Sequence, residues 1–288
     1  MKLDYHTLAI HIHKIELNVS SIEKSLDFYI NNLGFTVLKR TNEFVSLTVD
    51  QTNEMIRLYE TKDASPIDRK LGVYHFALLL PTRKDLSIFL KHLIQKQIPI
   101  TGAADHLVSE AIYLQDPDGI GIEIACDREQ IYWDNDKLSV PMDTLPFDYP
   151  GVYYEDKDHS IFTQLPQNTI IGHLHLQVSD LEKACDFYHH TIGFEITSKD
   201  FGGAVFLADA SYHHHLALNR LAESTLYPQG KHIGVESFTI QYPYCEKLIH
   251  SLNELKTQKK PIEETLNGYL IRDFDSNRIY LEIKHNEV

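Results

Sequence analysis

The sequence is poor in cysteine, in long apolar runs and in basic residues, and each shortage excludes a class of protein. Its three cysteines, Cys126, Cys185 and Cys245, are widely spaced and odd in number, which argues against a disulfide framework and fits a reducing compartment. No segment approaches the roughly 20 apolar residues of a membrane span, and the first residues lack the apolar core of a signal peptide. We therefore expect a cytoplasmic protein with no membrane partner.

Acidic residues outnumber basic ones, 41 against 27, and the formal net charge is −14 at pH 7. This balance disfavours a nucleic-acid partner, because phosphate binding requires a basic stripe on the surface. Hydrophobic residues make up 43% and charged residues 24% of the 288-residue chain, which is ordinary for a globular protein with a substantial core. The acidic excess is expected to be a solvated surface.

The most informative feature of the chain is an internal repeat. The segment IGHLHLQVSDLEKACDFYHHTIGFEI, which starts at Ile171, is a near copy of HKIELNVSSIEKSLDFYINNLGFTV, which starts at His13. Each copy reads as a strand and then a helix, which Ser20 or Ser21 can cap and Gly34 can end in the first copy. A second kind of unit runs from VYHFALLLP to EAIYLQDPDGIGIEIAC, and the segment from VESFTIQYP to YLIRDFDSNRIYLEI matches it.

The chain thus contains four strand–helix–strand–strand–strand units, and the odd and even units form two similar pairs. Because one unit cannot bury both faces of its sheet, we expect an α+β fold in which four βαβββ modules pair into two cup-shaped mixed sheets with the helices outside. The Pro-, Asp- and Tyr-rich segment 126–169 is expected to wrap around the body as an extended linker. The expected bounds are two modules in 1–125, at about 8–62 and 70–125, and two in 170–288, at about 170–222 and 232–284.

These repeats resemble the vicinal oxygen chelate superfamily, which includes glyoxalases, bleomycin-resistance proteins and extradiol dioxygenases. The resemblance covers nearly all of residues 8–284 and rests on GHLHLQVSDLEKACDFY with IGF after it, and on LGF after the first copy. YHFALLLP, together with DHLVSEAIYLQDPDGIGIE, resembles bacterial catechol 2,3-dioxygenases of the two-domain kind. The resemblance implies paired modules whose metal ligands lie on the inward faces of the first and last strands.

The resemblance implies His173, in GHLHLQV, as the first metal ligand, and strand alternation also points this side chain into the cup. His75 and Glu123 are the candidate ligands in the second unit. A carboxylate at the Glu123 position is costly to bury unless a cation pairs with it. Two imidazoles and one carboxylate suit an octahedral metal with open positions, here expected to be Fe(II), with Mn(II) possible. The alternative for His75 is a buried histidine that a backbone carbonyl satisfies.

The fourth and first units lack this set of ligands. Ser237 and Tyr280 stand in the fourth unit at the places of His75 and Glu123, and the first unit has Lys14 at the place of the metal histidine of the third. Units two and three are therefore expected to build the working cup, with units one and four as scaffold.

Two further site residues follow from the resemblance to extradiol dioxygenases. Tyr113, ten residues before Glu123, is expected to hydrogen-bond a substrate hydroxyl. His106, in DHLVSE, is expected to support the site from behind the ligands. The alternative for Tyr113 is a plain core aromatic on a hairpin strand.

The tract SYHHHLAL supplies the candidate acid–base catalyst, because His214 matches the catalytic histidine of the family's H-x-x-A-[LF] pattern. Strand parity would place His214 on the same face as Leu216, so either a bulge intervenes or His213 or His215 faces the cup instead. A surface tract that scavenges metal is the alternative for the three histidines.

The expected function is a metal-dependent extradiol dioxygenase, an oxidoreductase of aromatic hydrocarbon catabolism whose partners are a small catechol-type diol and O2. One alternative is a glyoxalase-like isomerase or thiol transferase, for which His215 is the candidate fourth ligand. Another is a non-enzymatic protein of the same fold that binds an aromatic ligand. The family also suggests a homo-oligomer.

Overall fold

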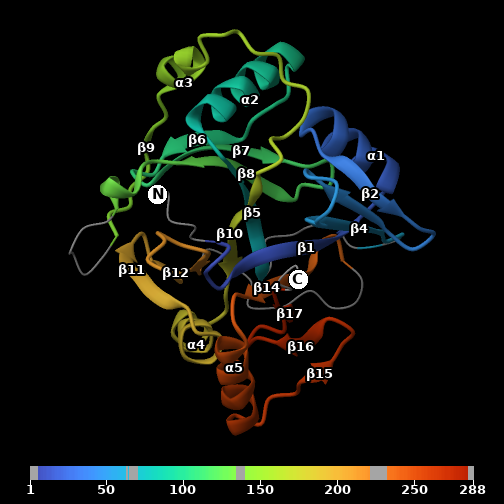
Figure 1. Cartoon of the computed structure of the whole chain (residues 1–288), viewed down its shortest axis with the longest axis vertical. Helices are drawn as coiled ribbons and strands as arrows, with labels where there is room; N and C mark the ends of the chain where they lie inside the picture. Colours follow the sequence, from blue (N-terminus) through green and yellow to red (C-terminus); the bar gives the residue numbers. More distant parts are fainter. Residues whose placement is uncertain (1–5, 63, 65–70, 134–139, 221–231, 285–288) are drawn as a thin grey trace.

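The structure, a computed structural model, describes residues 6–62, 64, 71–133, 140–220 and 232–284. Two mixed sheets with helices on their outer sides form the molecule (Figure 1). The strand order is β15-β16-β17-β14-β1-β4-β3-β2 in the eight-stranded sheet and β11-β12-β13-β10-β5-β8-β7-β6-β9 in the nine-stranded sheet. The expected α+β fold of paired modules is confirmed. Parts of the expected segments lie outside the described residues, namely 1–5, 63, 65–70, 134–139, 221–231 and 285–288.

The odd units share one order of elements, in which a short α-helix continues as a π-helical turn. The first unit consists of β1 (His11–Val19), α1 (Ile22–Leu26), η1 (Asp27–Asn32), β2 (Thr36–Arg40), β3 (Val45–Thr48) and β4 (Ile56–Glu60). The third consists of β10 (Ile170–Gln177), α4 (Leu181–Asp186), η3 (Phe187–Ile192), β11 (Glu195–Phe201), β12 (Ala204–Ala208) and β13 (Leu216–Asn219).

The even units contain one longer helix each. The second unit consists of β5 (Gly72–Leu80), α2 (Arg83–Lys96), β6 (Gly102–Asp105), β7 (Ser109–Gln115) and β8 (Gly121–Asp127). The fourth consists of β14 (Gly234–Tyr242), α5 (Cys245–Thr257), β15 (Glu263–Glu264), β16 (Gly268–Arg272) and β17 (Arg278–Ile283).

Each sheet combines one unit from either half of the chain. β1 pairs antiparallel with β14, so the first and fourth units share the eight-stranded sheet. β10 pairs antiparallel with β5, so the third and second units share the nine-stranded sheet. Units two and three thus share one sheet, and it stays a prediction that they build the working cup.

A β-bulge near the start of β10 sets the direction of the following side chains. Ile171 lies opposite Leu78 and His173 lies opposite Ala77, so Gly172 is left without a partner in the ladder. A Cβ atom at Gly172 would lie only 3.0 Å from Leu79 Cβ, so glycine allows the two strands to approach closely here. Because a bulge re-aims the residues around it, this one contributes to the direction of His173.

Local signals in the sequence explain where the helices begin and what they bury. The Ser21 side chain accepts a hydrogen bond from Lys24 N, as the expected N-cap of α1, and Thr82 caps α2 by accepting from Asp85 N. α2 buries its apolar stripe, which includes Phe89, against the sheet, and Gln97 ends the helix in the left-handed region at φ 55°. Among the described residues, no helix is long and apolar enough to cross a membrane.

Two buried aspartates tie the units of each half together. Asp116, in the DPDG turn before β8, accepts hydrogen bonds from Ile120 N at 2.8 Å and from the Tyr29 hydroxyl of η1 at 3.2 Å. In the other half, Asp273 accepts from the Tyr188 hydroxyl of η3 at 2.7 Å. Burial raises the pKa of both carboxyls from the ordinary value of 3.8 to about 6.

The linker differs in part from its expected extended course. It contains the short turn η2 (Gln130–Tyr132), the strand β9 (Leu145–Pro146), which pairs with β6, and the helix α3 (Tyr149–Glu155). α3 lies beside α2 at one end of the molecule (Figure 1). The missed signal was local, because Asp148 caps this helix through Gly151 N and Pro150 lies in its first turn.

Candidate metal centre

Three neighbouring strands bring His75, Glu123 and His173 together. β5 carries His75 and lies between β8, which carries Glu123, and β10, which carries His173. One potential ligand atom from each residue lies within 4.8 Å of the others. Among the residues that the structure describes, this is the only group of three or more such side chains at metal-binding spacing.

Both imidazoles converge on the same carboxylate oxygen. Glu123 Oε2 lies 3.1 Å from His75 Nε2 and 3.2 Å from His173 Nε2, and the three residues are only 2–7% exposed. Burial alone would raise the pKa of Glu123, but the neighbouring His173 and His75 rings lower it well below its ordinary value. Burial lowers the pKa of His75, which keeps that ring neutral and able to bind a metal.

The donor set fits the metal that the resemblance implies. His75 Nε2 is buried and has no hydrogen-bond partner, although Glu123 Oε2 lies close to it. A divalent cation would bind this nitrogen and would also pair the buried carboxylate charge. Imidazole and carboxylate together suit first-row divalent metals such as Fe(II) and Mn(II).

A glycine beside the triad allows β8 to lie close to β5. A Cβ atom at Gly121 would lie 2.7 Å from the Tyr74 carbonyl oxygen and 3.0 Å from His75 Cβ. A larger residue would have to displace the backbone that carries His75. Gly121 is therefore explained by the close packing of β8 against β5.

A cavity of about 710 Å³ opens over the triad. His106, Tyr113 and His214 line it together with the three candidate ligands, so the structure brings all six predicted site residues to one cavity. Met142 and Thr144 bring the linker into its wall. Apolar residues contribute to the rest of the lining, including Val73, Ile120, Phe206 and Val235.

Tyr113 and His106 form a hydrogen-bonded pair at the edge of this cavity. His106 Nδ1 donates to the Asp143 carbonyl oxygen at 2.8 Å, which leaves Nε2 of the neutral ring as an acceptor. The Tyr113 hydroxyl lies 2.6 Å from this nitrogen and donates to it. Burial and the nearby Glu123 charge raise the pKa of Tyr113, so its oxygen is a neutral acceptor that faces the cavity.

The histidine tract lies in a loop, so strand parity does not apply to it. β13 starts only at Leu216, and Ala210 and Ser211 precede the tract with φ values of 53° and 62°. His214 lines the cavity, and the centroid of its ring lies 4.2 Å from that of His173. The question left open by the sequence is thus answered in favour of His214.

The other two histidines of the tract are buried away from the cavity. His213 is 1% exposed and His215 is 0% exposed, which excludes a surface tract. His215 Nδ1 accepts a hydrogen bond from Asp209 N at 3.2 Å, and its ring packs against Phe194 and Tyr212. His215 is therefore not placed to supply the fourth ligand that an isomerase would need.

Sequence reasoning missed one residue beside the site, Asp127. It ends β8, and its Oδ1 lies 2.9 Å from His213 Nε2. The Tyr212 hydroxyl donates to Asp127 Oδ2 at 2.9 Å. No local signal marks Asp127, because its partners lie in a loop of the third unit and the contact exists only after the two units share a sheet.

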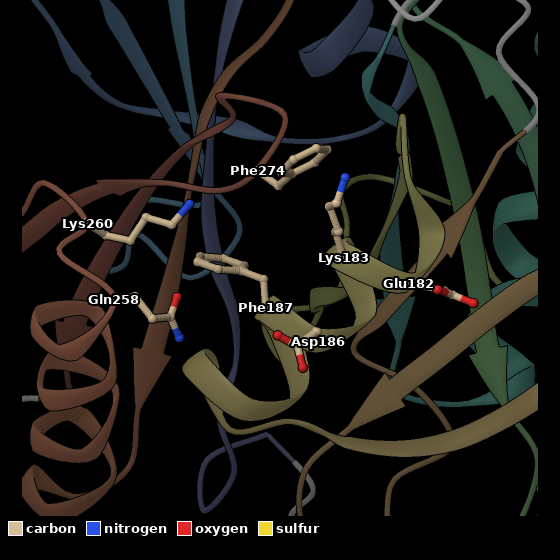
Figure 2. A pocket seen from close by; sticks show the side chains of 7 residues that line it. All are labelled: Glu182, Lys183, Asp186, Phe187, Gln258, Lys260 and Phe274. Carbon is tan, nitrogen blue, oxygen red and sulfur yellow. The ribbon is translucent and has the colours of Figure 1, made fainter.

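A second hollow, of about 430 Å³, lies on the surface where η3 approaches the loop after α5 (Figure 2). The Lys183 ammonium lies 4.9 Å from the centroid of the Phe274 ring at its rim. It contains none of the predicted site residues and no group of metal-binding side chains. Its lining consists of Glu182, Lys183, Asp186, Phe187, Gln258, Lys260 and Phe274.

Residues 11–124 and 170–279 match the Glyoxalase/Bleomycin resistance protein/Dioxygenase superfamily. The chain belongs to this superfamily. It is 41% identical over 268 residues to the Catechol-2,3-dioxygenase of Bacillus subtilis (strain 168), which covers 91% of this chain and 93% of that protein.

Solved structures share the fold at low sequence identity. A presumed dioxygenase from Bacillus subtilis subsp. subtilis str. 168 superposes with a TM-score of 0.69 at 14% identity, covering 96% of this chain and 86% of that chain. Glyoxalase I from Zea mays gives a TM-score of 0.59 at 16% identity, covering 95% and 92%. Family membership and the buried His–Glu–His group together support a metal-dependent enzyme.

Proposed function

We propose that this protein is an extradiol dioxygenase, which uses O2 to cleave the ring of a catechol-type aromatic diol. The observation that carries the proposal is the convergence of two buried imidazoles and one buried carboxylate below a cavity lined by apolar side chains. The similarity to a protein named Catechol-2,3-dioxygenase supports the same reaction. The proposed role lies in the breakdown of aromatic compounds.

His75, His173 and Glu123 would hold Fe(II), and Mn(II) is the alternative that the same donors suit. The bound metal would supply a single centre at which the diol and O2 meet. The protein itself contributes the cavity walls, which would fix the ring relative to this centre. Phe206 in the cavity wall would contact the flat face of an aromatic ring.

His214 is the proposed acid–base catalyst. Burial lowers its pKa well below the ordinary value, and the neighbouring His173 and His213 rings lower it further. The resting ring is therefore neutral and can accept a proton from a diol hydroxyl. The same ring can return that proton later in the reaction.

Tyr113 is the proposed substrate-orienting residue, and His106 is the residue that orients Tyr113. The Tyr113 hydroxyl donates to His106 Nε2, so its lone pairs remain available to accept a hydrogen bond from the diol. His106 is itself fixed by the Asp143 carbonyl oxygen of the linker.

The charge of the cavity wall supports an uncharged diol as substrate. Among the described residues that line the cavity there is no lysine or arginine, and Glu123 is the one carboxylate. A substrate with an acidic substituent would find no cationic partner there and would lose its hydration. We therefore propose a catechol with a hydrogen or apolar substituents.

The test is to load the metal-free protein with Fe(II) without oxygen and then to add catechol and air. The proposal expects a yellow ring-opened product that forms in step with O2 uptake, and neither signal in Glu123→Gln. Stoichiometric metal binding without O2 uptake for any catechol would favour an isomerase of the same fold. A protein that binds catechols but no metal would be a ligand-binding protein.

A further inference from the structure

A chain of three side chains runs from the surface of the nine-stranded sheet to the cavity. Asp127 Oδ1 lies 2.9 Å from His213 Nε2, and His213 Nδ1 lies 2.8 Å from His214 Nδ1. The last ring of the chain lines the cavity, and its centroid lies 4.2 Å from that of the His173 ring, with the two rings tilted at 45°. We refer to these residues as the Asp127–His213–His214 chain.

The surroundings hold this chain in place. The Asp127 carboxylate accepts a second hydrogen bond from the Tyr212 hydroxyl, and Trp133 packs edge-on against the His213 ring at 5.1 Å between centroids. His213 and His214 are 1% and 5% exposed, so water does not compete for their nitrogens. The two imidazoles must therefore satisfy each other.

With both rings neutral, only one arrangement of protons satisfies both hydrogen bonds. A carboxylate only accepts, so His213 carries its proton on Nε2 and donates it to Asp127. His213 Nδ1 then has a lone pair and must accept, so His214 carries its proton on Nδ1. The Nε2 atom of His214 is left with a lone pair, which is the state that a proton acceptor requires.

We propose that Asp127 and His213 are positioning residues that fix the tautomer of His214, so that its unprotonated Nε2 is presented to the cavity. The catalytic consequence rests on the proposed dioxygenase function, whereas the tautomer itself does not. In the reaction, the proton of a diol O–H bond passes to His214 Nε2 and leaves the bonding electron pair on the diol oxygen. His214 keeps its Nδ1–H···Nδ1 bond to His213 throughout. The arrangement follows the general logic by which a buried carboxylate orients a catalytic histidine.

Nitrogen NMR of the imidazoles tests the tautomers without any reference to catalysis. The full-length chain is labelled with ¹⁵N in its histidines and measured without metal at about pH 8, where unperturbed histidines are neutral. Signals are assigned with His213→Gln and His214→Gln. The proposal expects a proton on Nε2 of His213 and on Nδ1 of His214. A proton on Nε2 of His214 in the unaltered protein would overturn it.

Kinetics of the Fe(II)-loaded protein test the consequence. Asp127→Asn lets the amide donate to His213 and removes the fixed direction of both hydrogen bonds, so kcat for ring cleavage should fall about 10²-fold. Metal content and KM should stay within about twofold, because neither ligands nor cavity walls change. A lower kcat at unchanged KM, together with an altered His214 tautomer, supports the proposal. An unchanged kcat contradicts it.

Two variants separate positioning from a purely structural role. His213→Gln can donate to Asp127 and accept from His214, so it should retain most of the kcat that His213→Leu loses. Asp209→Asn alters a buried carboxylate on the other side of the same loop, which bonds Ile10 N and Lys247, and should leave the His214 tautomer and kcat unchanged. Equal losses in His213→Gln and His213→Leu would overturn the proposal. If the unaltered protein cleaves no catechol, the proposed function fails while the NMR result still decides the tautomer.

Discussion

Each of the two sheets buries a carboxylate, Glu16 or Glu123, and surrounds it with different partners. The two sheets correspond strand by strand: β1, β14 and β17 of the eight-stranded sheet match β10, β5 and β8 of the nine-stranded sheet. In the nine-stranded sheet the imidazoles of His75 and His173 face Glu123, and no lysine or arginine lines the cavity above it among the described residues. In the eight-stranded sheet Glu16 is only 6% exposed, and the chain supplies the cations itself.

The neutralising groups of the eight-stranded sheet are fixed side chains. Lys14 Nζ and Arg57 Nη1 each lie 3.5 Å from Glu16 Oε1, and the Ser237 hydroxyl donates to Glu16 Oε2 at 2.9 Å. Lys14 and Ser237 stand at the sequence positions that correspond to the candidate metal ligands His173 and His75. The Lys14 ammonium therefore pairs with the buried carboxylate of this sheet, as a metal ion would pair with Glu123 in the other sheet.

The comparison teaches how one fold can hold a site and a scaffold at once. A buried carboxylate needs a positive partner in either sheet, because burying an unpaired charge is costly. When the partners are a lysine and an arginine, the buried carboxylate is already paired within the chain. When the partners are imidazoles, their nitrogens and the carboxylate can together bind an external cation.

The largest effect is expected from removing a ligand in the working cup. His173→Ala or Glu123→Gln should abolish metal binding and lower ring-cleavage activity by about 10³-fold or more, since the chemistry requires the metal. The matched change in the other sheet, Tyr280→Phe, should leave metal content and activity unaltered. Metal analysis and O2 uptake measure both, and metal bound equally by the unaltered protein and by Glu123→Gln would break the comparison.

The buried aspartates should make stability depend on pH in both halves. The pKa of Asp273 is about 6 in the folded protein against 3.8 ordinarily, so the folded state favours the protonated form. The contribution of the protonated Asp273 carboxyl to stability is full below about pH 4 and is lost as the pH rises through about 6. The unfolding free energy should fall by about 3 kcal/mol over this range.

Asp273→Asn should therefore remove part of the fall in unfolding free energy between about pH 4 and 7, and Asp116→Asn should do the same in the other half. Urea unfolding at several pH values, compared between each variant and the unaltered chain, measures the difference. Parallel pH profiles would show that burial does not raise these pKa values.

Removing the carboxylate of the scaffold cup should cost stability but no metal. Glu16→Gln removes the carboxylate that pairs with Lys14, whereas Arg57 keeps its pair with Glu54. Because both cations are partly exposed, we expect a loss of about 2 kcal/mol of unfolding free energy. Fe(II) binding should be unchanged. A loss of metal binding in this variant would show that the two cups depend on each other.

The smallest effect concerns substrate charge. With no lysine or arginine among the described residues of the cavity wall, a catechol with a carboxylate substituent should have kcat/KM lower by about tenfold or more than one with a methyl group of similar position. Steady-state O2 uptake with the two substrates measures this ratio. A preference for the acidic substrate would contradict the proposed substrate class.

The repeat made most of the fold and the candidate triad predictable. Strand alternation places His173, His175 and Gln177 on one face of β10, and all three line the cavity. The hydrogen-bonding DPDG turn at Asp116 is likewise a local feature. Such features depend on residues close together in the sequence, so the sequence alone is enough to predict them.

The features that could not be predicted depend on contacts between units. Asp127 meets His213 only because β5 and β10 join two halves of the chain, and the approach of Gly172 to Leu79 arises at the same seam. The direction of His214 follows from the loop before β13 rather than from a strand, so periodicity gave no answer.

The central claim is that one metal ion binds between His75, Glu123 and His173. A crystal of the Fe(II)-loaded protein, measured above and below the iron absorption edge, tests this most directly. The account predicts one anomalous peak per chain, at about 2.0–2.3 Å from Nε2 of both histidines and from a Glu123 oxygen. A peak elsewhere, such as at the histidine tract, or no peak at the triad, would contradict it.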